Sequence, residues 1–144
     1  LLAQGGLLHD IGKSKTPEYL LSKPDKLTDE EWEMMRNHPV ESFDILSNTP
    51  GVDAFIVSIA TNHHEKLDGT GYPNGLKGPQ LDDPSLVASI VDVYSALTDK
   101  RSYKPAFSPE KSLNIMRDMC GHHLEDSFFK KFDEMIQSGA AGDL

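Results

Sequence analysis

Helix-start signals recur along this chain, whereas stretches that alternate apolar and polar residues are nearly absent. Thr28 and Glu31 form a Thr-x-x-Glu capping box, and Ser108 and Pro109 can cap and begin another helix. Residues 52–63 carry apolar side chains at helical spacing. Because half-buried strands need an apolar/polar alternation with a period of two residues, the sequence predicts an all-α fold.

The expected helices are joined by short segments except at one place, the polar loop over residues 64–83 with its several glycines. A structureless stretch of this length is uncommon in a compact domain and is usually functional. Gly12 is expected to stop the first helix. We predict helices over residues 1–8, 16–21, 39–47, 52–63, 108–119 and 125–136, and a strongly apolar helix that starts at Pro84 or Ser85 and runs to about Asp99. One more helix follows the capping box, with Trp32, Met34 and Met35 as its apolar positions. A frayed tail of residues 138–144 is expected on a core of residues 1–137.

Length and composition bound the class of protein. The 144 residues suit one domain, and a net charge of -9 disfavours binding to DNA or RNA. No apolar run reaches the roughly 18 residues of a membrane span, so no membrane contact is expected. The single cysteine, Cys120, excludes an internal disulfide and favours a reducing, cytoplasmic location. Because the chain begins with Leu1 rather than Met, within a helical pattern, we expect an N-terminally truncated fragment.

Histidine and aspartate residues occur where helices are expected to end or to be buried. His9 and Asp10 close the first helix, His63 and His64 close an apolar helix, and Asp92 lies inside the most apolar helix. Neutral imidazoles and carboxylates are good ligands for first-row metals. These residues and His38 are therefore candidate metal ligands. The alternatives are a buried hydrogen-bonded pair for His9–Asp10, a solvated helix end for His63–His64, a surface position for Asp92 and a helix cap for His38.

The glycine-rich loop and three basic residues have features that suit a phosphate ligand. The loop glycines permit close backbone approach, and Pro73 pushes Tyr72 toward extended geometry, which can aim its hydroxyl at a ligand. Lys13, Arg101 and Lys104 can hold phosphate oxygens, and Arg101 can do so with two hydrogen bonds at once.

Taken together, these residues resemble the HD-GYP family, a group within the HD superfamily of metal-dependent phosphohydrolases. The resemblance runs from His9-Asp10 and His38-Pro39 to the run His-His-Glu-Lys-Leu-Asp-Gly-Thr-Gly-Tyr-Pro at residues 63–73, and on through residues 92–98 and 101–104. The long signature is specific, whereas a His-Asp pair alone is not. The resemblance implies an HD-domain helical bundle with a long glycine-rich loop. It also implies a phosphodiesterase that hydrolyses cyclic di-GMP to pGpG or GMP in bacterial second-messenger signalling.

Residue roles follow from the resemblance, position by position. Asp10 matches the carboxylate that bridges metals, and His9, Asp10 and Lys13 are the expected catalytic group. Iron and manganese are the expected metals, with nickel and zinc as alternatives. Matched metal ligands, for two or three divalent ions, are His9, Asp10, His38, His63, His64 and Asp92; matched substrate-binding positions are Lys13, Tyr72, Arg101 and Lys104. His122 and His123 match no ligand and are expected at the surface.

One departure from the family pattern leaves other interpretations open. The family has a further histidine ligand, often with a glutamate, upstream of the HD pair, and residues 1–8 contain neither. The alternatives are an incomplete module that binds cyclic di-GMP or a signalling partner such as a diguanylate cyclase, a hydrolase of linear or hybrid cyclic dinucleotides, and a helical scaffold with incidental histidines. A dimer and an upstream regulatory domain are also compatible with the resemblance.

Overall fold

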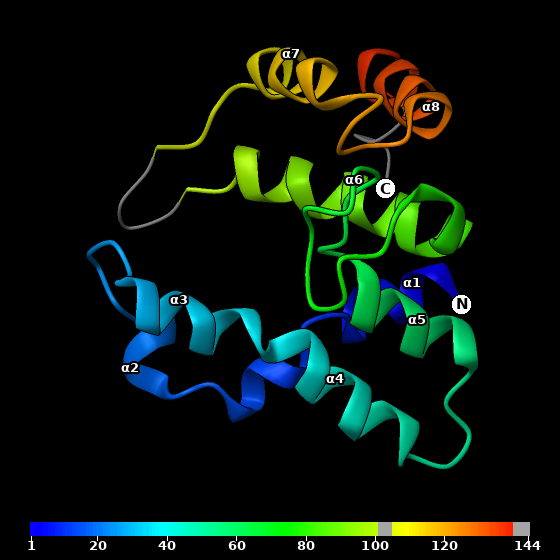
Figure 1. Cartoon of the computed structure of the whole chain (residues 1–144). Coiled ribbons are helices and arrows are strands. Elements are labelled where there is room, and N and C mark those ends of the chain that lie inside the picture. The colour runs from blue at the N-terminus through cyan, green and yellow to red at the C-terminus, as the bar shows by residue number, and fades with distance from the viewer. Residues whose placement is uncertain (101–104, 140–144) are drawn as a thin grey trace.

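The computed structural model describes residues 1–100 and 105–139, and within these ranges it contains helices and isolated β-bridges but no strand (Figure 1). This confirms the predicted all-α fold. In chain order, the elements are α1 (Leu2–Leu8), the 3-10 helix η1 (Ile11–Lys15), α2 (Glu18–Leu21), α3 (Asp29–Arg36), α4 (His38–Ser47), α5 (Ala54–Asn62), the 3-10 helix η2 (Gly78–Gln80), α6 (Asp83–Thr98), α7 (Pro109–Met119) and α8 (Asp126–Gln137).

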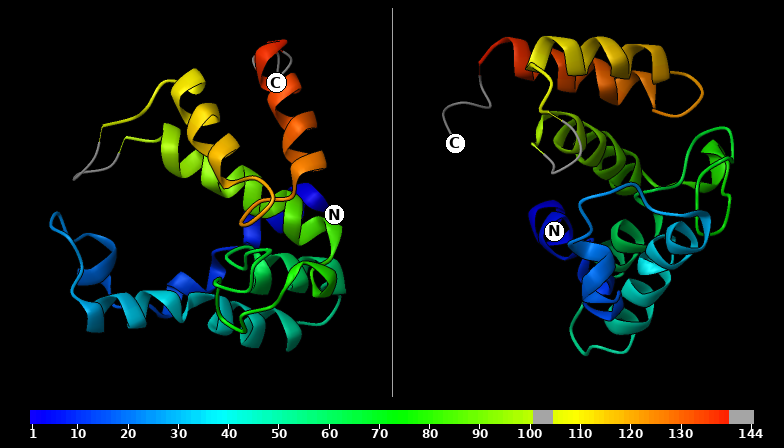
Figure 2. Two further views of the ribbon diagram at one scale, coloured as in Figure 1. Left: turned by 45° about the horizontal axis from the view of Figure 1, so that its top comes forward. Right: turned by 90° about the vertical axis from the view of Figure 1, so that its left-hand side faces the viewer.

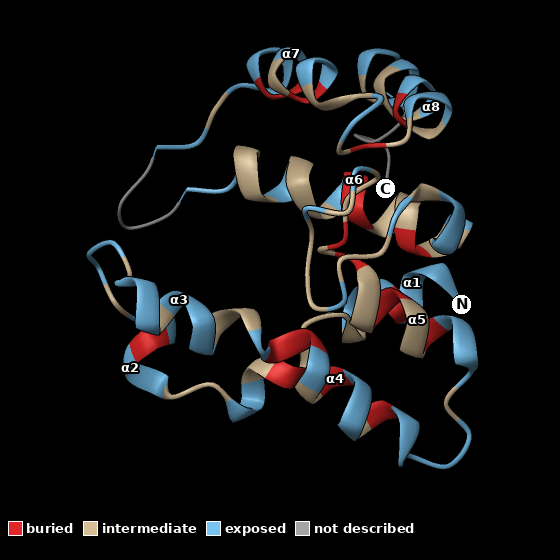
Figure 3. Ribbon diagram, in the orientation of Figure 1, coloured by how far each residue is buried: buried red, intermediate tan, exposed pale blue. Residues whose placement is uncertain are grey.

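Helix α6 is the central element, with α7 and α8 packed on one side and α1 and α5 on the other (Figures 1 and 2). Each side has its own apolar cluster, and the buried residues lie on the faces that the helices turn toward one another (Figure 3). The first cluster joins α6 to α7, α8 and the connection between them through Ile90, Leu113, Met116, Leu124 and Phe129. The second joins α4 to α5 through Leu46, Ile56 and Ala60.

Side-chain caps begin several helices as the sequence predicts. The Thr28 hydroxyl accepts a hydrogen bond from the Glu31 amide (3.3 Å), and the Glu31 carboxylate accepts one from the Thr28 amide (2.8 Å). Helix α6 begins at Asp83, one residue before the earlier of the two predicted starts, because Asp82 caps it by accepting a hydrogen bond from the Ser85 amide (3.0 Å). None of the described helices is long and apolar enough to cross a bilayer.

The predicted role of Gly12 as a helix stop is wrong. Helix α1 ends at Leu8, and Gly12 lies buried in η1 against α4. Its amide donates to the Ser42 hydroxyl (2.9 Å). A Cβ atom at this position would collide with the His38 carbonyl oxygen and lie 2.6 Å from the Ser42 amide nitrogen. Glycine is therefore required for the close approach of the His9–Asp10 segment to α4.

The apolar residues of α3 also lie differently from the expectation. Trp32 and Met34 were expected at apolar contact positions, yet both are exposed, and none of the eight residues of α3 is buried. Helix α3 is therefore held by polar contacts, such as Lys23 with Glu31 and Arg36 with Tyr72, rather than by a buried face of its own.

We expect Gly12→Ala to lower the free energy of unfolding by about 1–3 kcal/mol or more, because the added methyl group has no space. The matched control is Gly6→Ala in α1, where a Cβ atom would meet nothing within 4 Å. This control should be neutral or stabilising by about 0.5–1 kcal/mol, since alanine favours helix. Chemical denaturation of both variants tests the assignment, and equal stabilities would contradict it.

Candidate metal centre

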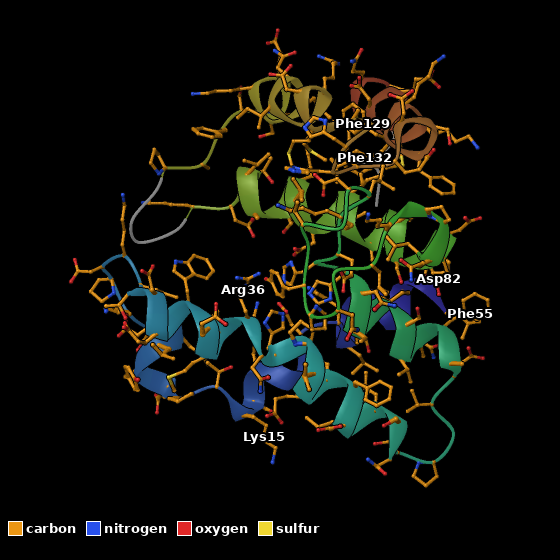
Figure 4. All side chains as sticks on the ribbon, viewed as in Figure 1. Lys15, Arg36, Phe55, Asp82, Phe129 and Phe132 are labelled. Atoms are coloured by element: carbon orange, nitrogen blue, oxygen red, sulfur yellow. The ribbon has the colours of Figure 1, made fainter. Side chains whose placement is uncertain are left out.

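Four separate segments bring the candidate ligands to one place. His9 and Asp10 follow α1, His38 is the first residue of α4, and His63 caps the C-terminal end of α5. His64 is next in the chain, and Asp92 lies on α6. Figure 4 shows the side chains that fill the space between these helices.

The inner part of the cluster consists of one carboxylate and three imidazoles. Asp10 Oδ1 lies 3.1 Å from His38 Nε2 and 3.7 Å from His63 Nε2, and the two Nε2 atoms are 3.4 Å apart. One ligand atom each from Asp10, His38, His63 and His64 lies within 4.8 Å of the others. Such spacing allows these atoms to bind a common cation.

Hydrogen bonds fix which nitrogen of each ring faces the centre. Nδ1 of His38 donates to the Met35 carbonyl (2.8 Å), and Nδ1 of His63 donates to the Ala60 carbonyl (3.1 Å). In this neutral tautomer each Nε2 carries a lone pair, as metal-binding histidines require. Both lone pairs then face Asp10 Oδ1. In the part of the chain that the structure describes, Asp10 Oδ1 is the one buried side-chain polar atom without a hydrogen-bond partner. Because these three atoms are all acceptors and lie close together, their arrangement suits a cation bound between them.

The remaining candidate ligands border this inner group. His9 Nε2 lies 3.3 Å from Asp10 Oδ2 and 3.7 Å from Asp92 Oδ1, and its Nδ1 contacts the Gly6 carbonyl (2.6 Å). His64 Nδ1 lies 3.7 Å from Asp92 Oδ2. The fold thus gathers all six residues singled out in the sequence. The surface alternative is wrong for Asp92, which is half-buried against two histidines. His38 also has its alternative role as a helix cap, because its Nδ1 bonds the Met35 carbonyl in the last turn of α3 while its Nε2 faces the cluster.

Burial and mutual contacts tune the charges of the cluster. Burial lowers the pKa of His63 to about 4; burial, reinforced by the charge of His63, lowers the pKa of His64 to about 3. Both rings are therefore neutral at pH 7. Burial alone would raise the pKa of Asp10, but the side chains of His38, His9 and Lys13 around its carboxylate outweigh burial and hold that pKa far below its usual range. Hydrogen bonds to Asp10 and then Asp92 raise the pKa of His9 to about 10. At neutral pH the metal-free cluster thus presents the Asp10 carboxylate between the neutral imidazoles of His63 and His64 and the protonated imidazole of His9.

Residues 2–127 match the profile of a family described as HD domain. The chain belongs to the HD domain family. It is 39% identical over 131 residues to the cyclic di-GMP phosphodiesterase PA4108 of Pseudomonas aeruginosa, and 45% identical over 118 residues to the 3'3'-cGAMP-specific phosphodiesterase 1 of Vibrio cholerae. These alignments cover 91% and 81% of this chain but only 31% and 27% of the relatives. The chain therefore spans less than a third of their length.

A solved structure has the same fold. Bd1817, an HDG"Y"P protein from Bdellovibrio bacteriovorus, matches 94% of this chain over 43% of its own length, with a TM-score of 0.74 and 23% sequence identity. The likeness confirms the predicted helical HD-domain bundle, and the family match confirms the predicted HD membership.

The glycine-rich loop of this HD domain lies directly against the cluster. The Tyr72 ring stacks on the His64 imidazole with a centroid distance of 4.7 Å and an interplanar angle of 24°. The Arg36 guanidinium lies over the Tyr72 ring, 4.6 Å from its centroid. Burial raises the pKa of the Tyr72 hydroxyl, which stays protonated. The family resemblance predicted a role for Tyr72 near the ligand. No sequence signal predicted Arg36, whose contact depends on where α3 meets the loop.

Glu65 is a functional position that sequence reasoning missed. Its side chain is 2% exposed, and its two carboxylate oxygens accept hydrogen bonds from the Asn74 amide (2.7 Å) and the Leu76 amide (2.9 Å). Gly71 packs so closely on the backbone of Glu65 and Lys66 that a Cβ atom would collide there. The sequence signal that could have identified Glu65 was its position as an acidic residue within the signature run, residues 63–73. Glu65 therefore clamps the loop that carries Tyr72.

The far side of the loop is tied to the connection between α7 and α8. The Leu67 amide donates to the His123 carbonyl (3.2 Å), and the Asp68 amide donates to the His122 carbonyl (2.9 Å). His123 Nε2 also lies 3.4 Å from Asp68 Oδ2. The expected surface position is confirmed for His122, whereas His123 is half-buried against the loop.

The basic residues predicted to bind phosphate divide into two groups. Lys13 lies beside the cluster, with its Nζ 2.5 Å from Asp10 Oδ2. Arg101 and Lys104 lie outside the described residues.

We expect Glu65→Ala to lower the free energy of unfolding by about 2–6 kcal/mol, because two part-buried amides lose their acceptor at about 1–3 kcal/mol each. The control is Glu134→Ala, an exposed acid of α8. Its effect should stay within about 0.5 kcal/mol. Urea denaturation of both variants gives the comparison, and a small effect at Glu65 would show that the clamp contributes little.

Proposed function

We propose that residues 1–137 form the hydrolytic core of a metal-dependent phosphodiesterase that cleaves cyclic di-GMP to pGpG or GMP. The observation that carries this proposal is the convergence of Asp10 Oδ1, His38 Nε2 and His63 Nε2, which face one another as acceptors. Relatives with 36–45% identity are named as phosphodiesterases of cyclic di-GMP or 3'3'-cGAMP, which supports the same class of substrate.

The proposed centre holds two or three divalent ions. Asp10 has one oxygen toward His38 and the other toward His9, so its carboxylate suits a bridging role. Iron and manganese suit a mixed imidazole and carboxylate set, as do nickel and zinc. The proposed ligands are His9, Asp10, His38, His63, His64 and Asp92.

When bound, divalent ions polarise a phosphoryl oxygen and lower the pKa of a coordinated water. The residues of the chain have separate tasks. Lys13, held beside Asp10, would stabilise negative charge on a non-bridging phosphate oxygen. Tyr72 keeps a protonated hydroxyl near the substrate. Arg101 and Lys104 are assigned to the phosphates from sequence alone.

A second candidate substrate is 3'3'-cGAMP, because the relative with 45% identity is named as specific for that dinucleotide. It differs from cyclic di-GMP in one base, whereas the cluster would act on the phosphodiester that both share. A diguanylate cyclase partner, a dimer and a cytoplasmic location remain further proposals, the last supported by the free thiol of Cys120.

Asp10→Asn and His63→Ala should each reduce both metal content and hydrolysis of cyclic di-GMP, by on the order of 100-fold or more, since even outer-shell partners of a metal are worth about 10–100-fold. The control is His122→Ala, an exposed histidine whose contact with the loop is made by its backbone carbonyl, which the substitution keeps. Elemental analysis and chromatography of the products measure the two effects on the full chain.

Wild-type metal content and turnover in Asp10→Asn would contradict the proposal. A wild-type protein that binds metal and cyclic di-GMP without turnover would identify the incomplete binding module instead.

A further inference from the structure

A hollow of about 600 Å³ lies between α3 and the glycine-rich loop. This volume is within the range of about 300–1,000 Å³ typical of small-molecule sites. Its loop side includes Tyr72, whose ring stacks on His64 of the metal cluster. A ligand in the hollow would therefore lie beside the proposed reaction centre.

Helix α3 supplies the opposite side of the hollow. Asp29, Trp32, Glu33 and Arg36 line it, and their spacing places them on one face of the helix. Trp32 is 49% exposed, although aromatic side chains of amphipathic helices usually face a core. An aromatic side chain that faces an open hollow offers its surface to a ligand.

Two of these residues present flat surfaces suited to a nucleobase. Bases stack on aromatic rings and on guanidinium planes. The Arg36 guanidinium already lies over the Tyr72 ring, 4.6 Å from its centroid, and is oriented from α3 toward the loop (Figure 4). Trp32 lies one helical turn before Arg36. The hollow thus has an indole and a planar cation on the same helix face.

The third feature is the carboxylate of Glu33. Its side chain is 77% exposed, and its Oε1 pairs with Arg36 Nη1 at 3.4 Å, so this exposed ion pair holds the carboxylate at the rim and leaves Oε2 toward solvent or a ligand. A carboxylate offers two acceptor oxygens and no donor. Guanine presents two neighbouring donors, N1–H and the 2-amino group, whereas adenine has an acceptor at N1. Glu33 therefore favours guanine over adenine.

We propose that this hollow is a guanine-selective base subsite, in which Trp32 and Arg36 stack on the base and Glu33 accepts hydrogen bonds from its donor edge. The proposal deepens the proposed function and rests on it for the rest of the substrate. It assigns base recognition to α3, while phosphate binding stays with the cluster and Lys13.

The sole tryptophan of the chain makes the subsite directly measurable. Guanosine and adenosine 5′-monophosphates contain no phosphodiester to hydrolyse, so both can be titrated against Trp32 fluorescence without turnover. We expect saturable quenching by the guanosine nucleotide at a concentration at least about fivefold lower than by the adenosine nucleotide, since a single base-edge hydrogen-bond pair is worth at least this much.

Variants separate the two recognition elements. Glu33→Gln should remove most of the preference for guanine. Trp32→Ala should raise the KM for cyclic di-GMP by about 5- to 100-fold, the range expected for a lost stacking partner. The matched control is Phe55→Ala on α5, since Phe55 is also 49% exposed but lies on the far side of the molecule from Arg36 (Figure 4). It should keep the wild-type KM.

The outcomes distinguish this proposal from the proposed function. Hydrolysis of cyclic di-GMP without selective quenching, or with an unchanged KM in Trp32→Ala, would overturn the base subsite and leave the phosphodiesterase intact. Selective quenching in a protein that hydrolyses no cyclic dinucleotide would support the subsite and refute the phosphodiesterase.

Discussion

The structure depends on one electrostatic constraint, the meeting of lone pairs at Asp10 Oδ1. An isolated buried carboxylate is costly, and two imidazole lone pairs aimed at it add to the cost unless a cation lies between them. The surrounding helices nevertheless hold this arrangement. Backbone carbonyls orient the rings of His38 and His63, and the contact between Gly12 and Ser42 presses the segment that carries Asp10 against α4. Hydrogen bonds that orient ligand rings in this way are typical of metal sites.

The glycine-rich loop connects this cluster to the rest of the domain. Glu65 holds the loop from within, Tyr72 stacks on a cluster imidazole, and Asp68 joins the loop to the α7–α8 connection. A displacement of α7 and α8 would therefore move the loop and change the contact between Tyr72 and His64. The long loop is thus an ordered part of the site, as loops of this length in compact domains usually are.

Sequence signals that act within a few residues predicted the helices well, but they did not predict the tertiary contacts between them. Caps at Thr28 and Ser108 and the apolar spacing of residues 52–63 act within a few residues, so helices could be read from the sequence. The ligand set came from a family resemblance, because spacing in the chain does not reveal that α1 and α6 approach each other. For the same reason, the role of Gly12 was predicted wrongly and that of Glu65 was not predicted, since each acts through a tertiary contact.

The distribution of charge explains how an acidic chain can bind an anionic ligand. A net charge of -9 repels phosphates in general, so attraction must come from a small region where the sign of the field is reversed. Lys13 and bound cations would provide that region at the cluster. Away from it, acidic residues no longer conflict with binding, because the base of a nucleotide is neutral and carries donors. A carboxylate such as Glu33 beside the hollow then favours a base with a donor edge while it repels misplaced phosphates. Phosphate binding and base selection can therefore use opposite charges only because they occur at separate places.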